Sequence, residues 1–450
     1  MDTVGSVTDQ AGDEGGGAQS APQRRLTTRE TAERLGVKPE TVYAYVSRGQ
    51  LSSNRAPGGR GSTFDAAEVD ALARRTGRRE PSSPAGEPAV RTGITLIESD
   101  RYYFRGVDAA ELALRYAYEE VAEWLWTGEL RPGMRFAAPA EALAAARRTV
   151  GALPAHAGST DRLRVAVVAA AAADPLRFDL SREAVLGGAR SLIPTLVAAL
   201  PTAGGDGGAE ASAGALAPDA ADGASGAGLA RQLWPKLTAQ PADEASLGVL
   251  DTALGLLIDH DLAASTLAAR VAASARAHPY AVVSAGLGVL EGPLHGAASG
   301  LAHRMLAEAL ERGGAAPVIA DHLRAGRRVP GLGHRLYTGE DPRAAALFAL
   351  LAEIPRAAPA LAAARDVVST TARHAPLHAN VDLALAVLSV SSGMDVEAGE
   401  TVFAIARTAG WIAHALEEYG ERPLRMRPLG RYTGPRPPQP LPGATDSPPQ

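Results

Sequence analysis

Apolar residues recur at helical spacing along most of this 450-residue chain. From residue 107 onward they are mainly Ala and Leu, which favour helices over strands. Breaks near Pro154, at Asp174-Pro175 and at Gly187-Gly188 divide residues 138 to 200 into separate helices. The pattern predicts a mainly all-α fold in which these helices supply the core.

Residues 91 to 106 (RTGITLIESDRYYFRG) depart from the helical pattern. In Ile94-Thr95-Leu96 and again in Tyr102-Tyr103-Phe104, every second side chain is large and apolar. Alternation of this kind is typical of strands with one buried face. We therefore expect two short strands around a turn at Ser99-Asp100.

A shorter three-helix pattern occupies residues 26 to 75. Thr27 or Thr28 suits the N-cap of the first helix, and Gly36 suits its end. A tight turn then leads into a second helix, which is the spacing of a helix-turn-helix. The expected elements are helices over residues 26 to 37, 38 to 46 and 65 to 75, with a glycine-rich, hairpin-like segment over residues 56 to 61.

This module resembles the small winged helix-turn-helix domains of the excisionase and MerR-like families. The resemblance implies that the second helix enters the major groove of DNA and that the basic wing contacts phosphate. Residues 22 to 79 carry 12 Lys/Arg against 6 Asp/Glu, a local charge of +6. A three-helix module used for oligomerisation or protein contact is the open alternative. The expected DNA contacts are Lys38, Thr41, Tyr43, Arg48, Arg55 and Arg60.

Composition excludes several classes of site. With no cysteine, the chain has no disulfides, thiolate metal sites or cysteine nucleophiles. The first 20 residues lack the apolar run of a secretory signal, and no window approaches 18 uncharged apolar residues. We therefore expect a cytoplasmic protein without a membrane span. The net charge of -5 argues against non-specific nucleic-acid binding by the whole chain.

Segments rich in Gly, Pro, Ser and Asp divide the chain. From Leu229 the helical pattern resumes unchanged, so the low-complexity segment before it interrupts one domain and does not separate two. We expect disorder over residues 1–22, 202–228 and 436–450, a linker over residues 77–90, and a helix-turn-helix domain over residues 23–76.

One loop has the composition of a segment that presents polar groups, Val329 to Arg343 (VPGLGHRLYTGEDPR). Two glycines and a proline directly before His334 prevent a regular helix, which places the imidazole on a loop. Asp341 suits the N-cap and Pro342 the first position of the next helix. A histidine and an arginine held nine residues apart could bind an anionic, carbonyl-bearing substrate. Equally, the histidine could satisfy buried backbone groups.

Three further stretches share this character. His260 lies between two acids at the end of an apolar helix, and His295 follows another such helix in a Gly/Pro-rich segment, EGPLHGA. Asp382 is set in an apolar run, where burial raises the pKa of a carboxyl group and makes it a better base. Singly, each residue could be a satisfied core histidine or a capping aspartate. Four such stretches in order favour a catalytic site.

Longer motifs carry a close family resemblance. GPLHG, GHRLYTGEDPRA and NVD, together with FAIARTAGWIAH at residues 403 to 414 and the later Arg427-Pro428 and RYTG, resemble citrate synthase. The resemblance covers residues 91 to 435 without the insert. It implies a two-domain helical fold in an obligate dimer, in which a small domain (residues 298–387) closes over a large domain (residues 91–297 and 388–435).

The resemblance also implies the role of each residue. Asp382 would take a methyl proton from acetyl-CoA while His295 donates a hydrogen bond to the thioester oxygen, and His334 would polarise the carbonyl of oxaloacetate and protonate the alkoxide. It implies no permanently bound cofactor and no metal, with acetyl-CoA as co-substrate. The residues that would bind the substrate carboxylates are His260, Arg343, Arg407 and, reaching in from the partner subunit of a homodimer, Arg427.

Several positions depart from the family pattern. Ala263 stands where an Asn is common, Leu383 replaces an aromatic residue, Thr338 replaces a frequent Lys, and Ala297-Ala298-Ser299 replaces Gly-Ala-Asn. A wider, less polar pocket could take another 2-oxo acid or propionyl-CoA, as in 2-methylcitrate synthase. The rival from another class is a DNA-binding regulator whose body only senses a ligand, and a bifunctional protein combines the two. The presence of all three catalytic residue types argues against a purely sensory body.

Overall fold

The computed structural model describes residues 25–35, 37–55, 61–75, 90–98, 100–204, 227–292, 295–428 and 433–436. The predictions of disorder at residues 1–22 therefore lie outside the described residues, as do most of those for residues 202–228 and 436–450 and for the linker at 77–90. The chain divides into two compact units, Met1–Arg91 and Thr92–Gln450, which are taken separately below.

The first unit combines the three predicted helices with a small antiparallel sheet. Thr27 is the N-cap: its backbone N–H and hydroxyl donate to Glu30 Oε2, and Glu30 N donates back to Thr27 Oγ1. The sheet order is β1-β3-β2. The predicted hairpin-like segment, residues 56 to 61, falls between β2 and β3 and lies outside the described residues except for Gly61, and β1 was not predicted. The elements are β1 (Arg25–Thr27), α1 (Thr28–Leu35), α2 (Pro39–Ser47), β2 (Ser53–Arg55), β3 (Ser62–Asp65) and α3 (Ala66–Arg75).

Its core is small and continuous. Leu35 of α1, Val42 of α2, Phe64 of β3 and Leu72 of α3 are all at most 3% exposed and belong to one apolar cluster. The three helices and the sheet therefore enclose a single core, which agrees with a folded helix-turn-helix module.

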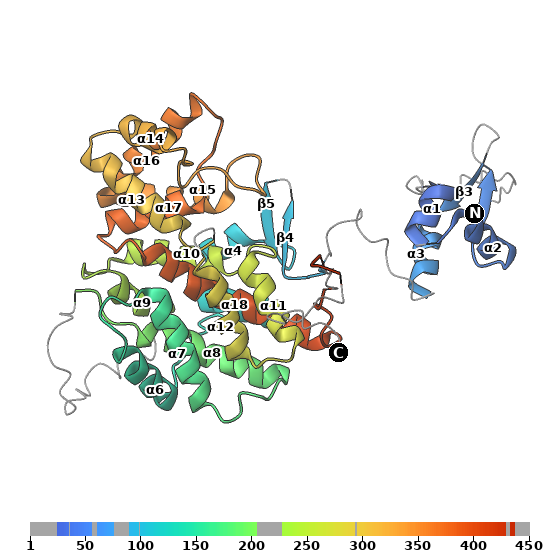
Figure 1. Cartoon of the computed structure of the whole chain (residues 1–450), viewed down its shortest axis with the longest axis horizontal. Helices are drawn as coiled ribbons and strands as arrows, with labels where there is room; N and C mark the ends of the chain where they lie inside the picture. Colours follow the sequence, from blue (N-terminus) through green and yellow to red (C-terminus); the bar gives the residue numbers. More distant parts are fainter. Residues whose placement is uncertain are drawn as a thin grey trace, which may run out of the picture. The chain divides into compact units, whose positions relative to one another are not determined.

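The second unit opens with the predicted hairpin and continues as helices (Figure 1). β4 (Thr95–Glu98) pairs with β5 (Arg101–Phe104), and β6 (Val107–Asp108), which was not predicted, pairs with β5. The helices are α4 (Ala109–Arg115), α5 (Tyr118–Thr127), α6 (Ala140–Gly151), α7 (Ser159–Ala173), α8 (Arg182–Ala199), α9 (Leu229–Leu237), α10 (Glu244–Leu257), α11 (Ala264–Ser274), α12 (Pro279–Leu290), α13 (Ala298–Glu311), α14 (Ala315–Arg324), α15 (Pro342–Ala352), the 3-10 turn η1 (Pro355–Ala357), α16 (Ala358–Ala372), α17 (Val381–Ser391) and α18 (Ala398–Gly420). The mainly all-α prediction is confirmed. The predicted break at Gly187-Gly188 is wrong, because both glycines lie inside α8, whose buried apolar face continues on either side of them.

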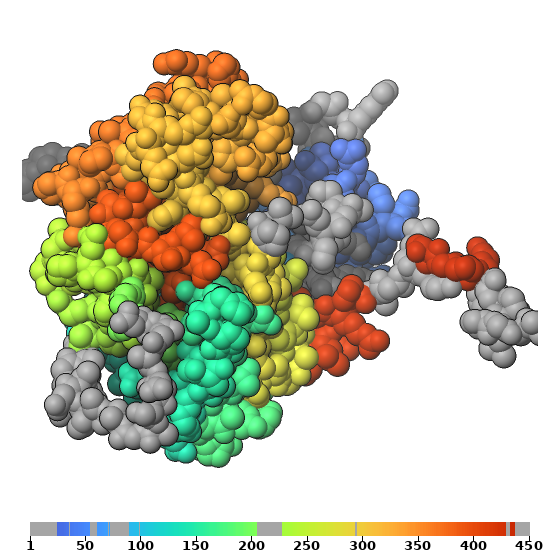
Figure 2. All heavy atoms as spheres, turned by 60° about the vertical axis from the view of Figure 1, so that its left-hand side comes forward, coloured from blue at the N-terminus to red at the C-terminus, as the bar shows by residue number. Residues whose placement is uncertain are grey.

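These helices form two groups. In Figure 1, α13 to α17 lie together at one end and α6 to α9 at the other, and Figure 2 shows the same grouping on the surface, in yellow to orange and in teal to yellow-green. α18 packs against α8, α10, α11, α12 and α17, and so contacts both groups. One apolar cluster runs through the whole unit.

Two glycines allow α18 to pack closely. A Cβ added at Gly410 would lie 2.1 Å from the carbonyl oxygen of Ile258, and one at Gly286 would lie 2.6 Å from the ring of Trp411. A larger residue at either position would force the helices apart. The close approach at Gly410 brings α18 against the residues that follow α10, where His260 lies.

Within the described residues, no single helix is long and apolar enough to cross a membrane. One pair, Pro342–Ala352 and Pro355–Ala372, passes the length and composition test only when both members are taken together, and it is bent by 117°.

Candidate active site

His334 lies on the segment between α14 and α15, called here the His334 loop (residues 325–341). Gly331 and Gly333 both have φ of 77°, a left-handed conformation that disfavours other residues. A Cβ at Gly331 would also lie 2.8 Å from Cβ of Leu383 on α17. The glycines that predicted a loop thus also permit its close approach to α17.

Backbone hydrogen bonds join the His334 loop to the residues before α17. Gly333 N donates to His378 O (2.7 Å), Asn380 N donates to Gly331 O (3.0 Å), and Asn380 Nδ2 donates to Gly333 O (2.9 Å). Asn380 Oδ1 in turn accepts from Asp382 N (3.0 Å) and caps the helix. His334 and Asp382, which are distant in sequence, therefore lie on two segments that are hydrogen-bonded to each other.

The hydrogen bonds of His334 define its tautomer. Nδ1 accepts from the backbone N–H of Leu336 at 3.0 Å, so the proton of a neutral ring must be on Nε2. Burial, assisted by the charge of Arg343, lowers the pKa of His334 to about 4. At neutral pH this residue is an uncharged imidazole with one N–H available to a ligand.

His260 meets His334 from the other side. The two rings are 5.1 Å apart and nearly perpendicular, and His260 is 7% exposed. Burial, with the charges of Arg343, Arg407 and His334, lowers the pKa of His260 well below its usual range. The structure thus brings together two histidines that the sequence predicted for one substrate.

Tyr337 links these two rings, and the sequence analysis gave it no role. Its hydroxyl is 2.7 Å from Nε2 of His260, and its ring centroid is 4.8 Å from that of His334. It is 5% exposed. Its place in the His334 loop, three residues after the histidine, was the only indication available from sequence.

Arg343, at the start of α15, is held by a buried carboxylate. Asp341 accepts from its Nε at 3.0 Å and from its Nη2 at 2.7 Å, and both side chains are at most 3% exposed. Asp341 also accepts from Arg343 N, as the predicted N-cap, and from Val381 N at the start of α17. Nη1 of Arg343 has no hydrogen-bond partner among the described residues, and can take a ligand oxygen.

Arg407 comes from the middle of α18. Its Nε donates to Leu257 O at 2.8 Å, and its guanidinium lies 4.4 Å from the centroid of the Phe403 ring. Burial lowers its pKa to about 10, against the opposing charge of Asp259, so it is a cation at neutral pH. The site therefore contains two buried guanidinium groups, of which that of Arg343 is paired with the carboxylate of Asp341.

Asp382 is half-buried in the first turn of α17. Burial raises its pKa to about 6, although the charge of Arg343 opposes the shift. This agrees with the expectation for a carboxyl group in an apolar run, and a carboxylate with this pKa is a stronger base than an exposed one.

His295 follows α12 and is half-buried. Its Nε2 is 2.7 Å from the hydroxyl of Ser265 on α11, and its ring lies 5.9 Å from that of Phe403. Burial, with the charge of Arg407, lowers its pKa. The sequence analysis did not single out Ser265, which lies 30 residues earlier and meets His295 only through the packing of the fold.

Asp259, directly before His260, belongs to a buried polar chain. Thr95 Oγ1 donates to one carboxylate oxygen at 2.5 Å, and His414 Nε2 is 3.1 Å from the other. Because Arg270 Nη1 can only donate to His414 Nδ1, the ring donates through Nε2. These buried hydrogen bonds fix the backbone from which the His260 side chain extends.

Arg427 is exposed and makes none of these contacts with the residues that the structure describes. Its segment is held by Leu424 N, which donates to Ser274 O, and by Arg425, which pairs with Glu418. The prediction that Arg427 serves a partner subunit stays a prediction.

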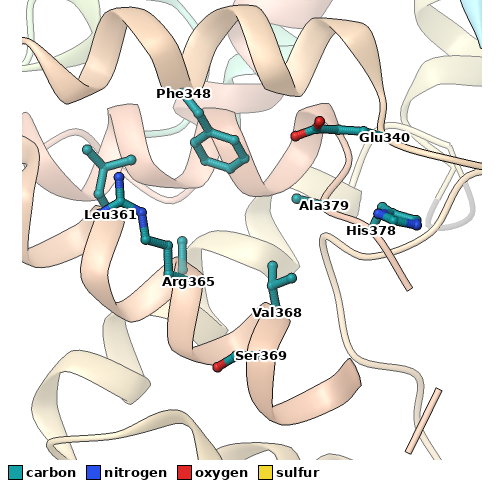
Figure 3. Close-up of a pocket in the computed structure, with 9 residues that line it drawn as sticks. Glu340, Phe348, Leu361, Arg365, Val368, Ser369, His378 and Ala379 are labelled. Atoms are coloured by element: carbon teal, nitrogen blue, oxygen red, sulfur yellow. The ribbon is translucent and has the colours of Figure 1, made fainter. Parts of the chain in front are cut away.

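A cavity of about 360 Å³ lies beside the segment that contacts the His334 loop, and His378 and Ala379 of that segment line it (Figure 3). Phe348 and Leu361 give it apolar walls, while Arg365 supplies a charge. None of the predicted catalytic residues lines it.

The described residues contain no group of three or more His, Cys, Asp and Glu that could hold a metal ion. The arrangement instead offers two buried cations, neutral imidazole donors and one strong base. Such a set can bind a small carbonyl-bearing dianion, polarise its carbonyl and remove a proton from a second molecule.

In the first unit, four of the six predicted DNA contacts lie on or beside α2. Lys38 and Arg48 are exposed, Tyr43 is 49% exposed and Thr41 is half-buried, while Val42 and Tyr45 of the same helix face the core. For Arg55 the structure describes only the backbone, in β2, and Arg60 lies outside the described residues.

Comparison with known proteins gives two family matches. The family described as "Citrate synthase, C-terminal domain" matches residues 84–429, and the family described as "Helix-turn-helix domain" matches residues 25–77.

Individual relatives agree with the larger match. Citrate synthase 2 of Bacillus subtilis (strain 168) is 33% identical over 214 residues, which cover 46% of this chain and 56% of the relative. The chain thus spans about half the length of that curated relative. A 2-methylcitrate synthase of Mycobacterium tuberculosis (strain ATCC 35801 / TMC 107 / Erdman) is 26% identical over 377 residues, which cover 78% of this chain and 89% of the relative.

Among solved structures, citrate synthase from Thermotoga maritima MSB8 superposes with a TM-score of 0.60 at 25% identity, covering 79% of this chain and 96% of that chain. The family match at residues 84–429 spans most of the chain and contains every residue of the candidate active site. The chain therefore belongs to the citrate synthase family.

Proposed function

We propose that this chain is an acyltransferase that condenses acetyl-CoA with oxaloacetate to give citrate and CoA. The observation that carries the proposal is the joining of the His334 loop to the start of α17, which combines a proton donor with the raised-pKa carboxylate of Asp382. A site that only sensed a ligand would need no such base.

The buried cations suit oxaloacetate. Arg343 and Arg407 both present guanidinium N–H donors to a site with neutral histidines, which suits a dicarboxylate, and Asp341 balances the charge of Arg343 in the free protein. Burial, with the positive charges of the arginines, lowers the pKa of His260 and of His334 and keeps both neutral in the free protein. Neutral imidazoles can donate hydrogen bonds to carboxylate or carbonyl oxygens without adding further positive charge to the site.

Proton abstraction from acetyl-CoA falls to Asp382, whose carboxylate takes a methyl proton. If the hydroxyl of Ser265 donates to Nε2 of His295, the imidazole proton is on Nδ1. His295 then donates this N–H to the thioester oxygen and stabilises the enol. Stabilisation of this kind is needed because a thioester methyl group is a far weaker acid than the conjugate acid of the base.

Carbon–carbon bond formation follows. The enol carbon attacks the keto carbon of oxaloacetate, and Nε2–H of His334 protonates the oxygen that becomes the hydroxyl. Water then cleaves the thioester of the condensed product, which releases CoA and citrate. CoA is a co-substrate throughout, and the proposal includes no permanently bound cofactor.

The test is a thiol assay of CoA release. Purified protein is given oxaloacetate with acetyl-CoA, and the expected result is turnover that depends on both substrates. If no pairing of a short acyl-CoA with a 2-oxo acid releases CoA, the enzyme proposal fails and a ligand-sensing body replaces it.

The same assay addresses the alternative substrate. Ala263 and Leu383 favour a less polar pocket, and the 2-methylcitrate synthase of Mycobacterium tuberculosis aligns over most of this chain. A kcat/KM for propionyl-CoA above that for acetyl-CoA would change the assignment to 2-methylcitrate synthesis and leave the chemistry unchanged.

A homodimer is part of the proposal. On α11, Leu267 and Val271 lie one turn apart and are 44% and 47% exposed, and Val168 on α7 is 62% exposed. Exposed apolar side chains one turn apart favour a covered helix face. Light scattering at micromolar concentration is expected to give twice the chain mass, and a monomeric mass would contradict the dimer.

Mixing inactive variants tests whether Arg427 crosses to the partner. In a dimer of Asp382→Ala and Arg427→Ala chains, one site regains both residues if Arg427 acts across the interface, and neither site does if it acts within its own chain. The expected result is restored activity after subunit exchange. Two inactive variants that stay inactive in verified mixed dimers would place Arg427 in its own site.

A second function, DNA binding, is favoured by the exposed polar face of α2. Lys38, Tyr43 and Arg48 face solvent in a unit that matches a helix-turn-helix family. A dimer would present two such units to a palindromic site. Selection of bound duplexes from a random DNA library by the full chain tests this: an enriched palindrome is expected, and no enrichment at low salt would favour a protein-contact role.

We include a cytoplasmic location in the proposal. The lack of cysteine is compatible with it, because the fold depends on no disulfide that a reducing compartment would break.

A further inference from the structure

Asp100, in the turn between β4 and β5, makes an unusual set of contacts. Its carboxylate accepts from Thr338 N at 2.8 Å, from Thr338 Oγ1 at 2.9 Å and from Gly339 N at 3.2 Å. These partners are 238 and 239 residues away in sequence. The carboxylate therefore does not satisfy its own turn, as turn aspartates commonly do. It holds the His334 loop.

The backbone of Asp100 is also unusual. Its φ is 59°, a left-handed conformation that costs most residues energy and that Asp tolerates better than most. Glycine would fit this turn without strain. An aspartate at this position gains its three hydrogen bonds at the expense of that strain, which argues for a role of the side chain.

The partner side of the contact is equally specific. A Cβ at Gly339 would lie 3.1 Å from Asp100 Oδ2, so a glycine leaves room for the carboxylate. The backbone N–H of Thr338, followed by the Thr338 hydroxyl, lowers the pKa of Asp100, which stays ionised. Hydrogen bonds to an ionised acceptor are stronger than those between neutral groups.

The same hairpin contacts the other half of the site. Thr95 of β4 donates to Asp259, directly before His260, and the ring of Tyr102 on β5 lies 5.7 Å from that of His260. The hairpin thus touches the His260 segment with its strands and the His334 loop with its turn. Between them lies Tyr337, whose hydroxyl meets His260 and whose neighbour Thr338 meets Asp100.

We propose that Asp100 is a positioning residue for the condensation: its three hydrogen bonds to Thr338 and Gly339 fix the His334 loop on the hairpin, and thereby fix His334 and Tyr337 against His260. The inference rests on the proposed function for its kinetic consequence. Asp100 touches no reacting atom, so its effect passes through the orientation of His334 and of the oxaloacetate pocket.

The test compares Asp100→Gly with Asp179→Ala in the full-length protein. Asp100→Gly removes the carboxylate and suits the left-handed turn, so it does not add backbone strain. Asp179 is a matched control, because its exposed carboxylate also accepts from a backbone N–H, that of Ser181, at 2.9 Å, but before α8. Each variant is measured for kcat, for both KM values and for thermal stability.

We expect Asp100→Gly to lower kcat/KM for oxaloacetate about 10- to 100-fold, the scale of a catalytic group displaced by about 1 Å. The KM for acetyl-CoA should change less than about twofold, because no Asp100 contact is to the His295 segment. Thr338→Val removes only the hydroxyl bond and is expected to cost about two- to tenfold. Asp179→Ala should match the wild type.

Hydrogen–deuterium exchange gives a readout that does not depend on turnover. Asp100→Gly is expected to raise exchange across residues 334–341, and Asp179→Ala is not. If Asp100→Gly lowers only the melting temperature, or leaves kcat/KM equal to that of the control, Asp100 is not a positioning residue. If the wild type lacks turnover, the proposed function fails, and hydrogen exchange still tests the contact. Unchanged exchange at residues 334–341 in Asp100→Gly would then overturn the role of Asp100 as well.

Discussion

The two units of this chain use positive charge in opposite ways. In the helix-turn-helix unit, Lys38 and Arg48 are exposed to solvent, whereas Arg343 and Arg407 of the larger unit are 3% and 1% exposed. An exposed cation binds any nearby anion, and salt weakens the attraction. A buried cation has lost its hydration and must be compensated within the fold.

The compensation is visible around each buried arginine. Arg343 has the paired carboxylate of Asp341, and Arg407 has the carbonyl of Leu257 and the face of Phe403. Each partner fixes the guanidinium in one orientation. The buried set, Arg343 and Arg407, can therefore select one small anion by geometry. The exposed set, Lys38 and Arg48, can attract a long polyanion.

The largest expected effect comes from the base that the buried set serves. Asp382→Asn keeps the shape of the side chain but cannot accept a proton, and we expect kcat to fall about 10²- to 10⁴-fold. Binding of oxaloacetate, measured by calorimetry, should change little. Asp395→Asn, at an exposed position before α18, is the control and should keep full activity. A rate within threefold of the wild type for Asp382→Asn would show that another group is the base.

Arg407→Lys tests whether geometry, beyond charge, matters in the buried set. Lysine keeps the positive charge but lacks the planar fork that can bond Leu257 O and a carboxylate together. Loss of a charged hydrogen bond of about 1.5–3 kcal/mol predicts an oxaloacetate KM about 10- to 100-fold higher.

The matched control is Arg312→Lys, an exposed arginine that pairs with Glu308 and Asp321, for which steady-state kinetics should be unchanged. Equal KM values in the two lysine variants would mean that charge alone binds the substrate, and would remove the contrast drawn between the two units.

The sequence predicted the parts of the site that local chemistry determines. Gly331, Gly333 and Pro330 marked the His334 loop, Asp341-Pro342 marked the start of α15, and the apolar run around Asp382 indicated its raised pKa. Each of these depends on the residue and its near neighbours.

What the sequence did not predict depends on distant partners. β1 and β6 are strands of three and two residues whose hydrogen bonds come from β3 and β5. Tyr337 and Ser265 gain their contacts to His260 and His295 only when segments 77 and 30 residues apart in sequence meet in the fold. Asp100 is a further case, because the sequence predicted only a turn at Ser99-Asp100, and its carboxylate bonds residues 238 and 239 positions away.

The pH profile examines the buried base directly. Because burial raises the pKa of Asp382 to about 6, the carboxylate is protonated and inactive below that pH. We expect kcat/KM to rise about tenfold per pH unit below pH 6 and to level off above it. His334, with a pKa of about 4, and Arg407, with one of about 10, should not titrate between pH 5 and 8. A profile that is flat from pH 5 to 8 would show that no group with a pKa near 6 acts as the base.

The exposed set should give a smaller and different response. If Lys38 and Arg48 contact phosphate, Lys38→Gln and Arg48→Gln should each reduce the slope of log K against log salt for DNA binding by about 1 and weaken binding uniformly across sequences.

Arg148→Gln, an exposed position on α6 in the other unit, is the control for overall charge and should leave the slope unchanged. Titration of labelled duplex at several salt concentrations measures all three. Condensation rates should stay the same in every variant, because none of these substitutions changes a residue of the active site. Equal slopes in Arg48→Gln and Arg148→Gln would mean that the exposed face of α2 does not contact DNA, and would favour a protein partner for the helix-turn-helix unit.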